Sequence, residues 1–169
     1  MPERYELYLI RHGLAEERGE AWPDDSKRPL TEEGISRLKK ESRGLTKIGV
    51  SFDIVLTSPL VRARQTAEII AAGLDPRPHL ANVDSLSPDG SYAALMADLA
   101  KHSRRERIAL VGHEPSIGEL SARLIGSRHP LPFRKGAICC IELDSMPPGG
   151  PGNLKWFLTP RLLRTLAKV

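Results

Sequence analysis

The segment Leu7-Tyr8-Leu9-Ile10-Arg11-His12-Gly13 decides the fold, because it joins an apolar run directly to a charged motif. Four consecutive apolar residues, 7–10, are typical of a short strand that is buried in a sheet. Gly13 then permits a sharp turn or a close backbone approach. The segment therefore predicts a buried strand that delivers Arg11 and His12 to a turn at its carboxyl end.

Two later apolar runs repeat this arrangement. Residues 52–57 are a strand candidate and lead into Ser58-Pro59, where Ser58 is expected to cap a helix whose first residue is Pro59. Residues 108–111 are the next buried strand candidate and end in Gly112-His113. Apolar spacing and capping residues predict helices between the strands, at 31–48, 59–73, 91–102 and 115–125. This alternation is typical of an α/β sheet with helices on both faces.

The C-terminal part continues the sheet in a different way. Residues 137–143 and 154–158 are strand candidates, and the Pro/Gly-rich stretch 147–153 between them is expected to be a hairpin connection. A last short helix is expected at 161–168. With 169 residues and no linker, the chain is expected to form a single domain, 1–169.

Composition excludes several classes of protein. Hydrophobic residues make up 40% and charged residues 27%, which is close to the average for soluble globular proteins. Apolar runs are too short for a membrane span, and charges interrupt the N-terminal run, so neither a membrane protein nor a secreted one is expected. The two cysteines, Cys139 and Cys140, are adjacent and point to opposite faces of a strand. A reducing, cytoplasmic setting is therefore expected.

The strand-end motifs predict an anion site. Ligands of α/β sheets bind beyond the carboxyl ends of the strands, so Arg11, His12, Arg62 and His113 are expected to converge there. Guanidinium groups match phosphate oxygens in pairs, and nearby cations favour a neutral histidine that can act as a nucleophile. The same cations would repel a metal ion, so no metal is expected. The net charge of +4 and the few aromatic residues give no support for nucleic-acid binding.

The ordered set of motifs resembles the histidine phosphatase superfamily, which is phosphoglycerate-mutase-like, and within it the phosphohistidine phosphatase SixA group. The resemblance covers nearly the whole chain. The residues that carry it are Leu9-Ile10-Arg11-His12-Gly13, Arg28-Pro29-Leu30-Thr31 with Gly34, Ser58 to Ala67, Val111-Gly112-His113-Glu114-Pro115 and Trp156-Phe157-Leu158-Thr159-Pro160.

The resemblance implies a three-layer α/β/α sandwich with a mostly parallel central sheet. It implies that His12 accepts the phosphoryl group, that Arg11 and Arg62 hold its oxygens, and that His113 stabilises the transition state. It implies a metal-independent hydrolase without a cofactor. The implied substrate is a phosphohistidine-containing signalling protein, such as a phosphotransfer domain, and a monomer is compatible with it.

Ser85 stands where many relatives place a glutamate that acts as a general acid, and Asp84 is the adjacent carboxylate. Phosphohistidine leaves as neutral imidazole and needs an acid much less than an alkoxide does, so this departure favours a phosphorus–nitrogen substrate. The short chain has no room for a large lid, which also suits a protein substrate. A phosphatase of small phosphomonoesters and a non-catalytic phosphohistidine-binding module remain the alternatives. Arg28 either lines the site or is an exposed loop residue.

Overall fold

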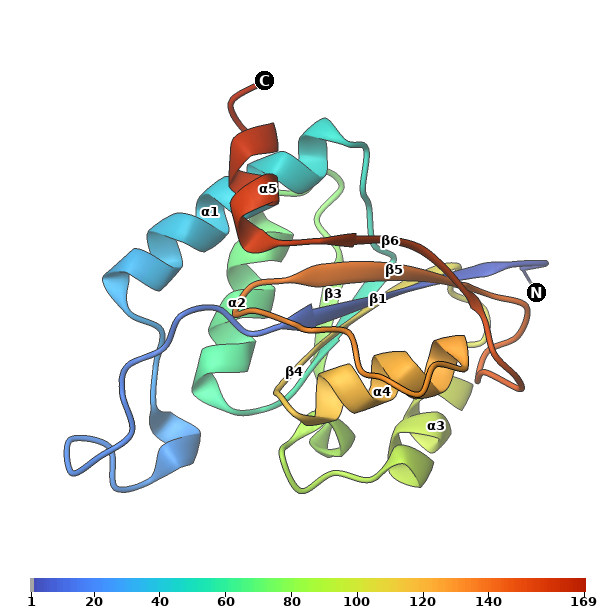
Figure 1. The fold of residues 1–169 in the computed structure, drawn as a ribbon, viewed down its shortest axis with the longest axis horizontal. Coiled ribbons are helices and arrows are strands. Elements are labelled where there is room, and N and C mark those ends of the chain that lie inside the picture. The colour runs from blue at the N-terminus through green and yellow to red at the C-terminus, as the bar shows by residue number, and fades with distance from the viewer. Residues whose placement is uncertain (1) are drawn as a thin grey trace.

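The computed structural model describes residues 2–169, which fold into a six-stranded sheet between two layers of helices (Figure 1). The strand order across the sheet is β3-β2-β4-β1-β5-β6. The strands are β1 (Tyr5–Arg11), β2 (Ile54–Thr57), β3 (His79–Asn82), β4 (Arg107–Gly112), β5 (Ile138–Leu143) and β6 (Asn153–Leu158). The helices are α1 (Glu32–Lys47), α2 (Val61–Ala72), α3 (Tyr92–Ala100), α4 (Ser116–Ile125) and α5 (Pro160–Leu166), with two 3-10 turns, η1 (Asp25–Lys27) and η2 (Asp84–Leu86).

The sheet is mostly parallel, as predicted. Strands β3, β2, β4 and β1 are parallel neighbours, and β5 and β6 complete the sheet as an antiparallel hairpin beside β1. The three strands that carry the motifs are adjacent and end at the same level, because Val111 of β4 lies opposite both Ile10 of β1 and Thr57 of β2. The predicted α/β/α sandwich is therefore confirmed.

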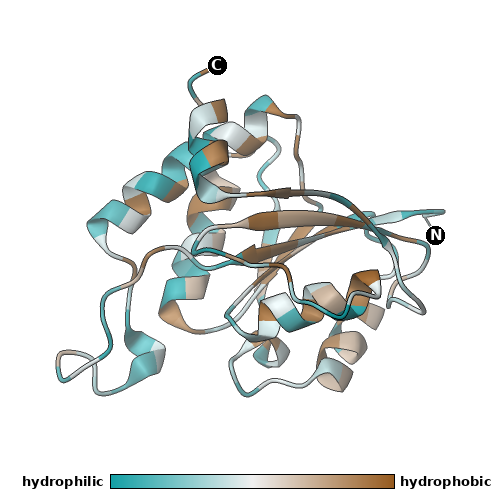
Figure 2. Ribbon diagram, in the orientation of Figure 1, coloured by the Kyte–Doolittle hydropathy of each residue, from teal (hydrophilic) through white to brown (hydrophobic). Residues whose placement is uncertain are grey.

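Each face of the sheet has its own apolar cluster. Helices α3 and α4 cover one face, where they pack on residues such as Leu9 and Cys139. Helices α1, α2 and α5 cover the other face, where they pack on residues such as Ile10 and Cys140. The middle of the sheet is mostly hydrophobic, whereas hydrophilic and hydrophobic residues are mixed along the helices (Figure 2). The two cysteines are free and lie on opposite faces, as predicted.

Helix α1 begins as the sequence predicts. The Thr31 hydroxyl accepts a hydrogen bond from the backbone N–H of Gly34 at 2.9 Å. The helix ends before Gly49, whose φ of 77° lies in the left-handed region that favours glycine. Among residues 2–169, none of the helices has the length and apolar character that a membrane crossing requires.

Helix α2 begins later than predicted, at Val61 and not at Pro59. The backbone N–H of Ser58 donates to the carbonyl of Val111 at 3.0 Å, so residue 58 still continues the hydrogen bonding between β2 and β4. Leu60 occupies the cap position without a capping side chain. The prediction that Ser58 caps this helix is therefore wrong, and its hydroxyl is available for another task.

Candidate active site

The carboxyl ends of β1, β2 and β4 surround one hollow of about 420 Å³, which we call the strand-end hollow. All four residues predicted from the motifs line it: Arg11, His12, Arg62 and His113. Arg11 ends β1, opposite Gly112 of β4, and His12 and His113 follow these two strands directly. The convergence of the motifs thus results from the parallel register of adjacent strands.

His12 is held by its own backbone turn. The residue is 6% exposed, and Nδ1 of its ring lies 2.7 Å from the carbonyl oxygen of Gly13. Because a carbonyl can only accept, Nδ1 carries the proton and Nε2 keeps its lone pair. Burial lowers the pKa of His12 to about 3, and the nearby charges of Arg62 and Arg11 act in the same direction. His12 is therefore neutral at pH 7 and has one nitrogen suited to nucleophilic attack.

Gly13 permits the close packing behind His12. A Cβ at this position would lie 2.7 Å from Cδ1 of Leu38 on α1. The Gly13 N–H donates to the Thr66 hydroxyl at 3.0 Å, and that hydroxyl donates to the carbonyl of Arg62 at 2.7 Å. Thr66 therefore ties the His12 turn to the first turn of α2, which carries Arg62.

Arg62 is almost completely buried, with 2% of its surface exposed. Its two terminal nitrogens bond Asp25, one to the backbone carbonyl at 2.9 Å and one to carboxylate Oδ2 at 3.0 Å. The other carboxylate oxygen of Asp25 accepts from Nε of Arg28 at 2.9 Å. Asp25 thus holds two arginines of the hollow at once. Burial opposes ionisation of this carboxyl, but the two arginines lower its pKa.

His113 lies across the hollow from His12, with ring centroids 5.2 Å apart. Its Nε2 is 2.7 Å from the Ser58 hydroxyl, and the oxygen of that hydroxyl accepts a hydrogen bond from the N–H of Leu60. The serine that does not cap α2 therefore orients His113. Burial lowers the pKa of His113 to about 4, and the charge of Arg62 adds to this effect.

Unpaired donors concentrate at this hollow. In residues 2–169, four buried side-chain nitrogen or oxygen atoms have no hydrogen-bond partner. Three of them belong to residues that line the strand-end hollow: Nε of Arg11, Nε of Arg62 and Nδ1 of His113. Native proteins rarely leave such groups unpaired, so each requires an explanation. A bound oxyanion would supply the acceptor that a donor at each of these positions lacks.

The structure also places Arg28, Asp84 and Ser85, for which the sequence suggested a role at the site or near it. Arg28 is 7% exposed and lines the hollow, so its interpretation as an exposed loop arginine is wrong. Asp84 is exposed and does not line the hollow. Ser85 donates to the carboxylate of Asp98 at 2.6 Å. Across residues 2–169, no three histidine, cysteine or acidic side chains are grouped as metal ligands.

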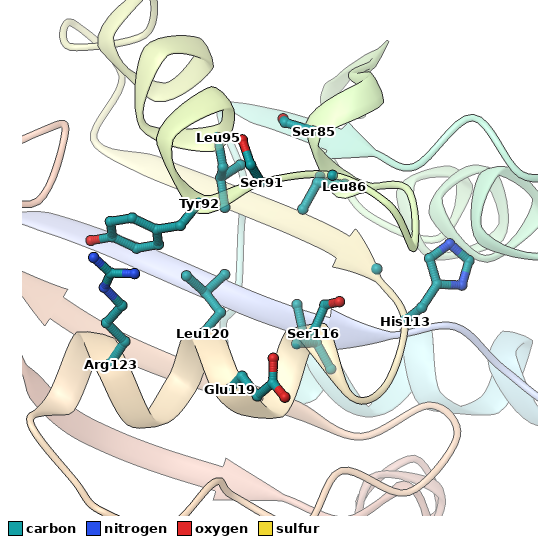
Figure 3. Close-up of a pocket in the computed structure, with 13 residues that line it drawn as sticks. Ser85, Leu86, Ser91, Tyr92, Leu95, His113, Ser116, Glu119, Leu120 and Arg123 are labelled. Atoms are coloured by element: carbon teal, nitrogen blue, oxygen red, sulfur yellow. The ribbon is translucent and has the colours of Figure 1, made fainter.

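A smaller, mostly apolar hollow of about 170 Å³ reaches His113 from the side of α3 and α4 (Figure 3). Ser85 and Leu86 form one wall, and Leu120 of α4 faces them. The guanidinium of Arg123 lies 3.5 Å above the ring of Tyr92 in the same hollow. The position at which a general acid was expected therefore opens onto this hollow and not onto the strand-end hollow.

Three residues of the site had no role assigned from the sequence: Asp25, and Thr66 and Glu114, which lie within the motifs that carry the resemblance. Asp25 and Thr66 hold Arg62 and Gly13 in place, and Glu114 lines the hollow while its carboxylate accepts from the N–H of Gly118 at 2.7 Å. Only the position of Glu114, directly after the His113 motif, gave a signal for it. Asp25 lies in a polar loop, and nothing in that loop distinguishes it from Asp24.

Comparisons with known proteins identify relatives of the whole chain. The family model of the histidine phosphatase superfamily (branch 1) matches residues 7–84. An uncharacterised protein of Picosynechococcus is 40% identical over 138 residues, 79% of this chain and 82% of that protein. The phosphohistidine phosphatase SixA of Escherichia coli is 28% identical over 157 residues, 92% of this chain and 94% of that protein. A solved structure of the protein histidine phosphatase SixA with tungstate superposes with a TM-score of 0.82 at 28% identity, over 94% of this chain and 99% of that chain.

Proposed function

Because the chain belongs to the histidine phosphatase superfamily and, within it, to the SixA group, we propose that it hydrolyses phosphohistidine on a protein. One observation carries the proposal. Three buried nitrogens without a hydrogen-bond partner belong to Arg11, Arg62 and His113, and these residues line the same hollow as neutral His12. This arrangement suits a phosphoryl group that meets hydrogen-bond donors while its phosphorus faces a nucleophile.

The first step transfers the phosphoryl group to His12. Nε2 of His12 attacks phosphorus, a new nitrogen–phosphorus bond forms, and the bond between phosphorus and the substrate imidazole breaks. The substrate leaves as neutral imidazole, since the proton on its other ring nitrogen stays in place. Phospho-His12 then carries a positive ring, and Nδ1–H keeps its bond to the carbonyl of Gly13.

The second step is hydrolysis. Water attacks phosphorus and the bond to Nε2 of His12 breaks. Both protons of the water remain with the phosphate, which is released as H2PO4⁻, and His12 returns to its neutral form. Nε2 of His113 lies 2.7 Å from the Ser58 hydroxyl. In the proposed mechanism that hydroxyl donates to Nε2, and the ring proton of His113 is on Nδ1. His113 then donates from Nδ1 to a phosphoryl oxygen in both steps. Apart from the substrate and water, every group that acts in these two steps is a side chain or backbone group of the protein, so the proposed reaction uses neither metal nor cofactor.

A phosphatase of small phosphomonoesters is the second candidate, and Glu114 is the observation that favours it. Glu114 lines the strand-end hollow, and burial raises its pKa. The raised pKa makes this carboxyl more available as a proton donor. An ester substrate leaves as an alkoxide and depends on such a donor. Against this candidate, Oε1 of Glu114 already caps α4 through Gly118. A non-catalytic binding module is less well supported, since it has no use for a free Nε2 on His12.

The proposal is tested by phosphate release from a phosphohistidine-bearing phosphotransfer domain and from a sugar phosphate. The proposed function predicts release from the domain, loss of that release in His12→Ala, and no loss in the control His129→Ala, which removes an exposed ring. Faster phosphate release from the sugar phosphate would overturn the proposed function and would favour a phosphatase of small phosphomonoesters. Tight binding without release from either substrate would leave a binding module.

A further inference from the structure

A second hollow, of about 640 Å³, lies beside the strand-end hollow between α1, the start of α5 and the loop before β5. We call it the basic hollow. Three residues line both hollows: Arg11, Leu14 and Lys135. The two hollows are therefore neighbours on one surface, and a ligand seated at His12 that is large enough extends into the basic hollow.

The basic hollow has a strong excess of positive charge. Six cationic side chains line it against one carboxylate, Glu41: Arg11, Arg37, Arg134, Lys135, Arg161 and Arg164. The proposed reaction uses only Arg11 of these. Arg37 is paired with Glu33 on its own helix. Within residues 2–169, Arg134, Lys135 and Arg161 form no ion pair, and all three are exposed.

The single carboxylate does not balance these cations. Glu41 is 2% exposed, its Oε2 lacks a hydrogen-bond partner, and its Oε1 is 3.7 Å from the guanidinium of Arg164. Burial raises its pKa to about 8, although Arg164 and Arg37 act in the opposite direction. The carboxyl is therefore mostly neutral at pH 7, and the basic hollow keeps its positive potential.

We propose that the basic hollow binds carboxylate side chains that flank the phosphohistidine of an acidic protein substrate. This inference rests on the proposed function and adds to it the kind of protein that is recognised. Charge complementarity favours an acidic partner, and the shared wall with the strand-end hollow places that partner beside the reacting group. The cations belong to the end of β1, two helices and a loop, and most of them are exposed. This spread suits several carboxylates on a protein surface better than one compact anion.

The basic hollow then separates two kinds of substrate. A protein reaches both hollows at once, whereas free phosphohistidine fills only the strand-end hollow. Removing positive charge from the basic hollow is therefore expected to weaken turnover of the protein alone. The matched variants are Arg134→Glu/Arg161→Glu in the hollow and Arg104→Glu/Arg105→Glu on an exposed loop elsewhere, with the same change of charge.

Four measurements on the full chain test the inference: kcat/KM for a phosphorylated phosphotransfer domain, kcat/KM for free phosphohistidine, inhibition by inorganic phosphate, and binding of the unphosphorylated domain by calorimetry. The domain used carries an acidic surface around its histidine. For Arg134→Glu/Arg161→Glu we expect KM for the domain to rise about tenfold, and binding of the domain to weaken by a similar factor. Free phosphohistidine turnover and phosphate inhibition stay within about twofold, and the loop variant behaves as wild type.

Each other outcome overturns the inference in a distinct way. Equal losses in the two double variants would show that overall charge, and not this hollow, attracts the domain. A changed inhibition constant for phosphate would make the hollow a small-anion site. Unchanged KM and unchanged binding would exclude docking there. If the wild type releases phosphate from neither substrate, the proposed function fails, while the calorimetric comparison still decides whether the basic hollow binds the acidic domain.

Discussion

Replacing Arg62 by lysine is expected to remove most of the activity while leaving the charge in place. The two terminal nitrogens of Arg62 are committed to Asp25, and its Nε remains for a phosphoryl oxygen. Lysine has a single nitrogen, which cannot serve the Asp25 carbonyl, the Asp25 carboxylate and the phosphoryl oxygen from one point. A lost hydrogen bond to a charged group costs about 1.5–3 kcal/mol. Since about 1.4 kcal/mol corresponds to tenfold in rate, kcat/KM should fall about 10- to 150-fold.

Arg64→Lys is the matched control for this prediction. Arg64 lies on the same turn of α2, but it is partly exposed and bonds Glu68 and Asn82. Exposed ion pairs such as Arg64–Glu68 contribute about 0.2–1 kcal/mol to stability. Arg64 does not line the strand-end hollow. We expect kcat/KM for the phosphorylated domain to stay within about twofold, with urea unfolding confirming that both variants are folded. Full activity in Arg62→Lys, or equal losses in the two variants, would refute the assignment of Arg62 to the phosphoryl group.

Three further predictions concern the buried groups. Proton NMR should show no titration of the His12 and His113 rings between pH 5 and 8, because burial lowers their pKa values to about 3 and about 4; a midpoint near 6.5 for either ring would contradict this. Gly34→Ala places a Cβ 2.2 Å from the carbonyl oxygen of Leu14 and should lower the free energy of unfolding by about 1–3 kcal/mol, whereas Gly150→Ala has open space and should change it by less than about 0.5 kcal/mol; equal urea midpoints would be inconsistent with this packing. The pKa of Glu41 is raised from 4.5 to about 8, so the unfolded chain ionises first as the pH rises through this window and folding becomes less favourable; Glu41→Gln should therefore gain stability over wild type at pH 8 relative to pH 5, and a pH-independent difference would argue against a buried neutral carboxyl.

The sequence predicted that Arg11, His12, Arg62 and His113 lie together, because this arrangement follows from local patterns and one topological rule. Apolar runs ending in Arg11-His12 and in His113 mark strands, and parallel neighbours bring their ends together. Arg62 needed only its place in the first turn of the helix after β2. These sequence patterns are local and do not depend on side-chain packing. The predicted convergence of the motifs therefore remains correct even where a helix or strand begins a few residues from its predicted start.

The missing details depend on contacts between distant parts of the chain. Arg62 and Asp25 are 37 residues apart, and the loop that carries Asp25 has no periodic pattern. The start of α2 was misplaced by two residues because Ser58 remains bonded to β4 and its hydroxyl meets His113. The preference of serine for helix caps cannot predict the contact of Ser58 with β4 or its contact with His113.

Helix α1 shows a signal that was present but hidden by residue type. Glu41 lies at helical spacing between Leu38 and Leu45, on the face that packs inward, whereas Ile48 at the end of that apolar pattern is exposed. A purely hydrophobic pattern assigns a glutamate to solvent. Burial favours the neutral form of this one carboxyl at pH 7, so Glu41 offsets little of the positive charge of the six cations that line the basic hollow.

In the proposed mechanism, His12 carries the phosphoryl group during turnover. The most direct measurement is rapid mixing with a ³²P-labelled phosphohistidine domain, an alkaline quench that preserves phosphohistidine, and mapping of the label in the enzyme. The proposed mechanism predicts label that appears on His12 before phosphate is released and then decays, with none in His12→Ala. Release of phosphate without label on the enzyme, or label on another residue, would contradict it.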